Sequence, residues 1–139
     1  MYHGTGINDS ATIVAKAAAD IQGGAFLAAM LTKDGVAVAK AGEAAIGIMI
    51  PETDSPKAGE DVNIQVKDIG LAMAGAAVEA GDLLTSDANG KLVKAASGNF
   101  ILATALGAAA AAGQVISVQI IKAGYAAAAA SGSGGSSGT

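Results

Sequence analysis

A degenerate internal repeat constrains the fold of this chain more than any other feature. Residues 84–121 form its clearer copy, and residues 31–66 form a looser one. Each copy holds a Leu-Thr pair, a turn containing Asp and Gly, short apolar runs, and a closing stretch with a glutamine. The interval from turn glycine to central isoleucine is the same in both, Gly35 to Ile46 and Gly90 to Ile101. The repeat predicts one small β-unit used twice.

Short apolar runs separated by turn residues extend over most of the chain. Residues 61–66 alternate, with Val62, Ile64 and Val66 on one face, which is the period of a half-buried strand. The alanine run at 108–112 is bracketed too closely by glycines to form a stable helix. The expected strands are 12–14, 25–31, 36–40, 45–50, 61–66, 69–74, 82–85, 91–95, 100–106 and 115–121.

This spacing of strands and turns predicts an all-β protein, a small barrel or sandwich built from two quasi-repeated β-units. Residues 1–22 are expected to form an extended N-terminal arm and the first strand. The β-domain is expected over residues 23–125, with its quasi-repeats at about 31–66 and 84–121. Residues 126–139 run from alanine into Gly and Ser, which predicts a flexible C-terminal tail.

The apolar content of the chain is mostly alanine. Hydrophobic residues make up 52% of the sequence, but aromatic residues only 3%. A buried methyl group contributes on the order of 0.8 kcal/mol, so an alanine-rich core is thin for a domain of this size. We therefore expect the protein to be more stable as an oligomer than alone.

Charge and cysteine content disfavour several classes of partner. The net charge is −4 and every basic residue is a lysine, whereas nucleic-acid binders concentrate Lys and Arg against phosphate. No nucleic acid is therefore expected as a partner. No membrane is expected either, because no apolar run approaches the roughly 20 residues of a spanning helix. The first ten residues have neither the basic start nor the apolar core of a Sec-type signal. Without cysteine, the chain has no disulfide or thiolate metal site.

No constellation of catalytic residues stands out. The single histidine, His3, lies in the expected arm. The acidic pairs Glu52 with Asp54 and Glu60 with Asp61 flank a loop, where carboxylates are normally solvated. Residues 87–90 faintly resemble a calcium loop, but a hairpin turn explains them better because the rest of the calcium-binding pattern is missing. We expect no enzymatic activity, no catalytic residue, no cofactor and no metal.

Three segments of the second copy together resemble a known family. They are the AGDLLTSD stretch at 80–87, the GKLV stretch at 90–93, and the run from Ile101 to Ala105 that leads to GQVI at 113–116. This pattern is similar to the capsid cement, or head decoration, proteins of tailed bacteriophages.

The resemblance implies a structural protein of the virion. Proteins of this family typically sit as trimers on the outer capsid surface, where they brace neighbouring copies of the major capsid protein, after assembly in the host cytoplasm. They often dock an extended terminal arm by strand addition. On this basis the candidate capsid contacts are Tyr2, His3, Ile7, Thr12 and Ile13.

Two other functions fit the same composition. A self-assembling fibre or surface-layer subunit would need no capsid partner and would form an open, head-to-tail interface. A carbohydrate-binding or hydrolytic β-domain is disfavoured, because sugar sites use aromatic platforms and the only tyrosines, Tyr2 and Tyr125, lie near the ends of the chain.

Overall fold

The computed structural model describes residues 10–50 and 55–127. This part of the chain contains ten β-strands and no helix, which confirms the all-β prediction. One strand overlaps each of the ten segments where the sequence predicted one. The strands are β1 Thr12–Lys16, β2 Ala28–Thr32, β3 Gly35–Val38, β4 Gly47–Met49, β5 Asp61–Gln65, β6 Asp68–Met73, β7 Leu83–Ser86, β8 Leu92–Lys94, β9 Phe100–Ala105 and β10 Val115–Tyr125.

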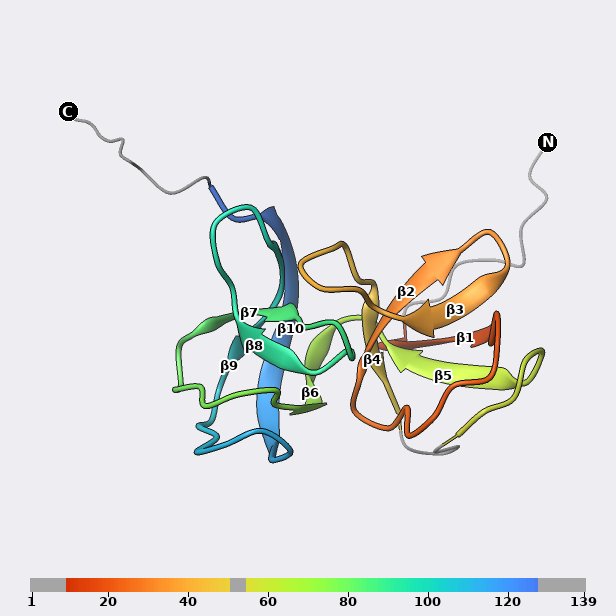
Figure 1. Cartoon of the computed structure of the whole chain (residues 1–139), viewed down its shortest axis with the longest axis horizontal. Coiled ribbons are helices and arrows are strands. Elements are labelled where there is room, and N and C mark those ends of the chain that lie inside the picture. Colours follow the sequence, from red (N-terminus) through yellow and green to blue (C-terminus); the bar gives the residue numbers. More distant parts are fainter. Residues whose placement is uncertain (1–9, 51–54, 128–139) are drawn as a thin grey trace.

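The strands form two five-stranded antiparallel sheets with the same topology. The first has the order β1-β5-β4-β2-β3 and the second β6-β10-β9-β7-β8, so adding five to each strand number of the first gives the second. Each sheet curls until its edges meet at a parallel bridge, Ala17 with Val36 and Ala74 with Leu92. We call residues 12–65 the first barrel and residues 68–125 the second barrel; they lie side by side in Figure 1. The expected reuse of one β-unit is confirmed.

Strand pairing corrects the alignment of the two copies. Ala29 pairs with both Val38 and Gly47, and Leu84 pairs with both Lys94 and Ala103. Ala29 is therefore the equivalent of Leu84, whereas the sequence pattern matched Leu84 with Leu31. Both copies are rich in alanine and glycine, which do little to fix an alignment. The sequence pattern therefore matched the leucines with each other, although they occupy different register positions.

Each barrel has its own buried cluster, and the second cluster reaches into the first barrel. The first includes Val36, Met49 and Ile64, all of them buried. The second is lined by alternate residues of β10, namely Ile116, Val118 and Ile120, while the residues between them face outward. It also takes in four residues of the first barrel, Ala28, Ala39, Ala45 and Ile48. The two barrels therefore share a buried apolar contact.

Backbone hydrogen bonds reinforce this junction. The N–H of Ala28 donates to the carbonyl of Gly90 at 2.7 Å, and the N–H of Met73 donates to the carbonyl of Phe26 at 3.0 Å. Gly90 has a φ of +80°, and a Cβ there would lie 2.6 Å from a methyl carbon of Val38, so only glycine allows this approach. A linker of two residues, 66 and 67, separates β5 from β6. The barrels are thus held as one unit.

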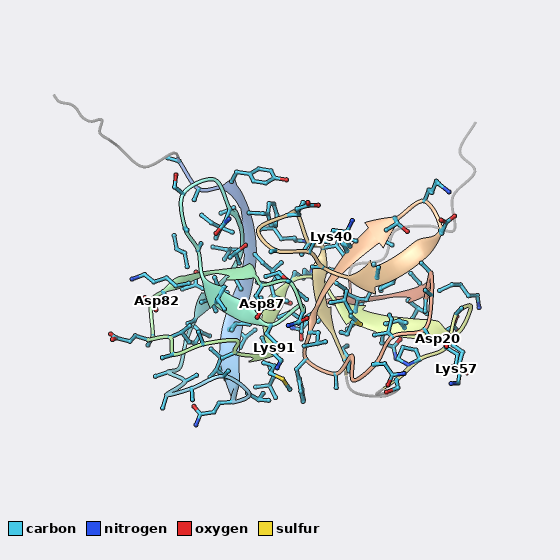
Figure 2. The ribbon with its side chains drawn as sticks, viewed as in Figure 1. Asp20, Lys40, Lys57, Asp82, Asp87 and Lys91 are labelled. Carbon is cyan, nitrogen blue, oxygen red and sulfur yellow. The ribbon has the colours of Figure 1, made fainter. Side chains whose placement is uncertain are left out.

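The turn that carries Gly90 is organised by the carboxylate of Asp87. Its Oδ1 accepts hydrogen bonds from the N–H groups of Asn89 at 2.8 Å and Lys91 at 3.0 Å. Figure 2 shows Asp87 and Lys91 close to the junction of the barrels. This is the hairpin turn that the sequence favoured over a calcium loop.

Thr85 allows the energetic cost of an unpaired buried hydroxyl to be tested. Its side chain is buried, and its Oγ1 has no hydrogen-bond partner within the described residues. Replacing Thr85 with the isosteric valine is expected to raise the free energy of unfolding by about 1 kcal/mol, because an unpaired buried hydroxyl is removed. Ser86→Ala is the matched control, expected to lower stability by about 1 kcal/mol, since the Ser86 hydroxyl donates to the Asp87 carbonyl at 2.8 Å. Chemical denaturation measures both; a destabilised Thr85→Val would contradict this account.

Candidate interaction surface

One cross-strand row of the second barrel faces outward and carries no charge. Strand register places Leu83 opposite Thr104, Thr104 opposite Gln119, and Gln119 opposite Ile69. We call these four residues the second-barrel row. Leu83 is 44% exposed and Ile69 62% exposed, and no member of the row is charged. The row crosses β7, β9, β10 and β6, so it spans most of the outside of the barrel.

Further apolar side chains extend this row into a face. Leu71 and Val115 lie on the same side of β6 and β10, and Leu106 follows β9. With Ile69 and Leu83, these residues are between 42 and 62% exposed. We call the row together with Leu71, Leu106, Val115 and Ser117 the second-barrel face. Large apolar side chains that gather exposed on one side of a domain mark interaction surfaces on soluble proteins.

Strand β6 shows that this exposure is built into the sequence. Its inward positions are small, Gly70 and Ala72, while its large side chains, Ile69 and Leu71, point outward and are exposed. A strand that served only the core of its own barrel would have the opposite arrangement. The second-barrel face is therefore suited to contact with another protein surface.

The first barrel has an equivalent row, half of which is covered. Register places Ala28 opposite Ile48, Ile48 opposite Gln65, and Gln65 opposite Thr12; we call these four the first-barrel row. Ala28 is 0% and Ile48 2% exposed, and both belong to the cluster built mainly by the second barrel. Part of the first-barrel row is thus a contact surface between the barrels, whereas the second-barrel row is uncovered.

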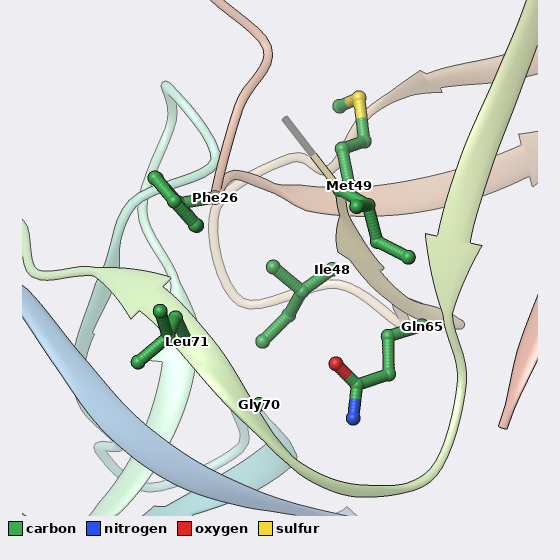
Figure 3. Close-up of a pocket in the computed structure, with 7 residues that line it drawn as sticks. Phe26, Ile48, Met49, Gln65, Gly70 and Leu71 are labelled. Carbon is green, nitrogen blue, oxygen red and sulfur yellow. The ribbon is translucent and has the colours of Figure 1, made fainter. Parts of the chain in front are cut away.

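A hollow of about 300 Å³ lies where the two barrels meet, beside Ile48 and Gln65 of the first-barrel row. It is lined by Phe26, Ile48, Met49, Ile50, Gln65, Gly70 and Leu71, most of them apolar (Figure 3). Phe26 has a φ of 68°, a left-handed conformation that is unfavourable for an aromatic residue. Its N–H donates to Met49 at 2.9 Å while its carbonyl accepts from Met73, so the unusual backbone connects the barrels.

The predicted capsid contacts are only partly within the described residues. Tyr2, His3 and Ile7 lie outside them. Thr12 and Ile13 both belong to β1, where Thr12 is half-buried and Ile13 packs against the cluster of the first barrel. Ile13 therefore directs its side chain toward the core of its own barrel.

Acidic side chains in the described residues serve local structure. Glu60 accepts a hydrogen bond from the Lys57 N–H at 2.8 Å, and Asp61 pairs with Lys16 at 2.7 Å on an exposed surface. No group of three His, Cys, Asp or Glu residues that could hold a metal occurs in ranges 10–50 and 55–127. Within the same ranges, no helix is long and apolar enough to cross a membrane. Glu52 and Asp54 lie outside the described residues.

The sequence reasoning missed the second-barrel face. It assigned contacts to the arm, and it treated the outward positions of strands as polar. The signal was present in β6 and β7, where apolar residues occupy consecutive positions and so must point to both sides of the sheet.

Comparison with known proteins agrees with this architecture. The sequence model of the phage cement protein family matches residues 6–120. The chain therefore belongs to the phage cement protein family and is a structural protein associated with the phage capsid. No curated protein sequence gives a significant match.

A solved structure shares the fold. The head fiber gp8.5 N base of bacteriophage phi29 superposes with a TM-score of 0.62 at 19% identity, covering 81% of this chain and 95% of that one. At this identity the similarity is one of fold.

Proposed function

We propose that this protein decorates and stabilises a phage capsid by binding the outer surface of the major capsid protein as a homotrimer. Its role is non-enzymatic, and it is located on the outside of the virion after assembly in the host cytoplasm. Membership of the phage cement family supports the capsid partner. The second-barrel face is the observation that supports the self-association in this proposal, because exposed apolar side chains on an uncharged surface favour burial against protein.

The N-terminal arm is the proposed capsid anchor. Strand β1 lies at one edge of the first sheet, and residues 1–11 precede it. An arm at a sheet edge can pair with a partner strand through backbone hydrogen bonds and needs few specific side chains. In this proposal Tyr2, His3 and Ile7 supply the side-chain contacts, while Thr12 and Ile13 contribute through the backbone of β1.

Deletion of residues 2–9 tests the anchor. We expect the shortened protein to keep its melting temperature and its solution mass, because the strands of both barrels are intact. Its affinity for capsids is expected to fall at least tenfold, which corresponds to about 1.4 kcal/mol. Co-sedimentation with capsids that lack the protein measures the affinity, and light scattering measures the mass.

Deletion of residues 128–139 is the matched control, and it should leave capsid binding unchanged. Undiminished binding without the arm would contradict the anchor. Failure of the full-length protein to sediment with capsids would contradict the capsid partner itself. If it then formed filaments, a self-assembling fibre or surface-layer subunit would be the better assignment.

A further inference from the structure

The duplication offers a template for a contact that would cover the second-barrel row. Its equivalent, the first-barrel row, is packed against the second barrel of the same chain. The elements that cover it are the Gly90 turn, whose carbonyl accepts from Ala28, and strand β6. Leu71 of β6 shares the hollow with Ile48, and Gly70 lies against the side chain of Gln65.

Strand equivalence identifies the counterpart of Leu71 in the first barrel. Val14 pairs with Asn63 in β5 as Leu71 pairs with Ser117 in β10, and the register of both pairs makes Val14 the counterpart of Leu71. Val14 points outward from β1 and is 59% exposed. Leu71 thus lies across the hollow from Ile48 of the first-barrel row and keeps 48% of its surface exposed, whereas Val14 faces no such row within the described residues.

Each chain therefore exposes both surfaces of this kind of contact, each without its partner surface. β6 lies against the first-barrel row, but no strand lies against the second-barrel row in the described residues. In the same way, β1 with Val14 has no row beside it, although its counterpart, β6 with Leu71, has one. We propose that β1 of one copy packs through Val14 on the second-barrel row of the next copy, repeating between chains the contact made within the chain. This inference deepens the self-association in the proposed function and is independent of which surface meets the capsid.

Such a contact joins two different surfaces. Heterologous contacts of this kind close into a ring when the rotation between copies permits it, and otherwise continue into a filament. A two-fold contact of the second-barrel row with itself would leave Val14 unused. The two arrangements differ in what a change at Val14 does, which makes them separable by experiment.

Single substitutions on the two halves test the contact. Val14→Glu and Leu83→Lys are each expected to raise the dissociation constant for self-association about 30-fold or more, because a charge is placed in an apolar contact without a partner. Both residues are exposed, so the circular dichroism spectrum of the folded protein should stay unchanged. Leu31→Lys is the matched control, since Leu31 is 50% exposed but lies on neither surface. Gln119→Lys is a second variant of the row.

Mixing the two variants gives the sharpest result. The Leu83→Lys protein retains its Val14 side, and the Val14→Glu protein retains its second-barrel row, so one intact contact remains between them. Sedimentation velocity is expected to show monomers for each variant alone and a one-to-one complex for the mixture. Dissociation by Leu83→Lys with no effect of Val14→Glu would overturn the proposal, as would wild-type mass in both variants or a monomeric wild-type protein.

Capsid co-sedimentation separates this inference from the proposed function. If the wild-type protein self-associates through Val14 and Leu83 but does not sediment with capsids, the inference holds and the capsid role fails. If it sediments with capsids while both variants keep the wild-type mass, the capsid role holds and the inference fails.

Discussion

Replacing Leu102 with alanine is expected to lower the free energy of unfolding by about 2–5 kcal/mol. Leu102 is fully buried and belongs to the cluster that contains Ala28 and Ile48 of the first barrel. Its side chain is much larger than those of the alanines around it, so neighbouring residues can fill little of the space that it leaves. Because the cluster includes both barrels, we expect them to unfold together in one transition. Urea denaturation followed by circular dichroism measures the change.

Leu106→Ala is the matched control for this experiment. Leu106 lies four residues after Leu102, directly after the end of β9, and is 43% exposed. Its truncation is expected to cost less than about 1 kcal/mol, since much of the side chain is already in water. Equal losses for the two variants would contradict the assignment of Leu102 to a shared core, and two separate transitions in the wild-type protein would contradict a single unit.

Gly47→Ala is expected to destabilise the protein by about 3 kcal/mol, which is the upper range for overpacking. Gly47 lies in β4, and a Cβ at this position would overlap the carbonyl oxygen of Gln65 in β5 and lie 3.0 Å from a methyl carbon of Ile64. Because the obstacle is backbone, relief requires the two strands to separate. The equivalent position in the second barrel is Ala103, so the restriction belongs to the first barrel and not to the topology.

Gly107→Ala is the control for the glycine experiment. A Cβ on Gly107 would meet no atom within 4 Å, and its φ is not in the left-handed region. Its effect on the free energy of unfolding is expected to stay within about 0.5 kcal/mol. Thermal melting of both variants decides the matter; tolerance of alanine at Gly47 would show that β4 and β5 are not this close in solution.

Much of the fold was readable because turn chemistry and alternation are local signals. Residues 61–66 alternate, and the structure buries Val62 and Ile64 of this segment as predicted. Asp87 and Gly90 indicated a turn, and the hydrogen bonds of Asp87 confirm it. The sequence left open whether the repeat formed one sheet or two, because strand order depends on contacts between distant segments that no local pattern records.

The candidate interaction surface was harder to predict for a physical reason. Hydrophobicity alone does not distinguish a residue that faces its own core from one that faces a partner. Leu83 and Leu84 are adjacent and chemically identical, yet Leu84 is buried and Leu83 is 44% exposed. Only the register of β7 against β9 determines which of them points outward.

The confinement of each sheet to one continuous half of the chain has a consequence for synthesis on the ribosome. All strand pairing of the first barrel lies within residues 12–65, so this barrel can form before the second has been translated. During that interval Ala28 and Ile48 have no cover, and we expect the nascent protein to be most prone to aggregation and chaperone capture then. Stalled chains whose first 66 residues have left the ribosome would show this as stronger chaperone crosslinking than chains whose first 127 residues have left it.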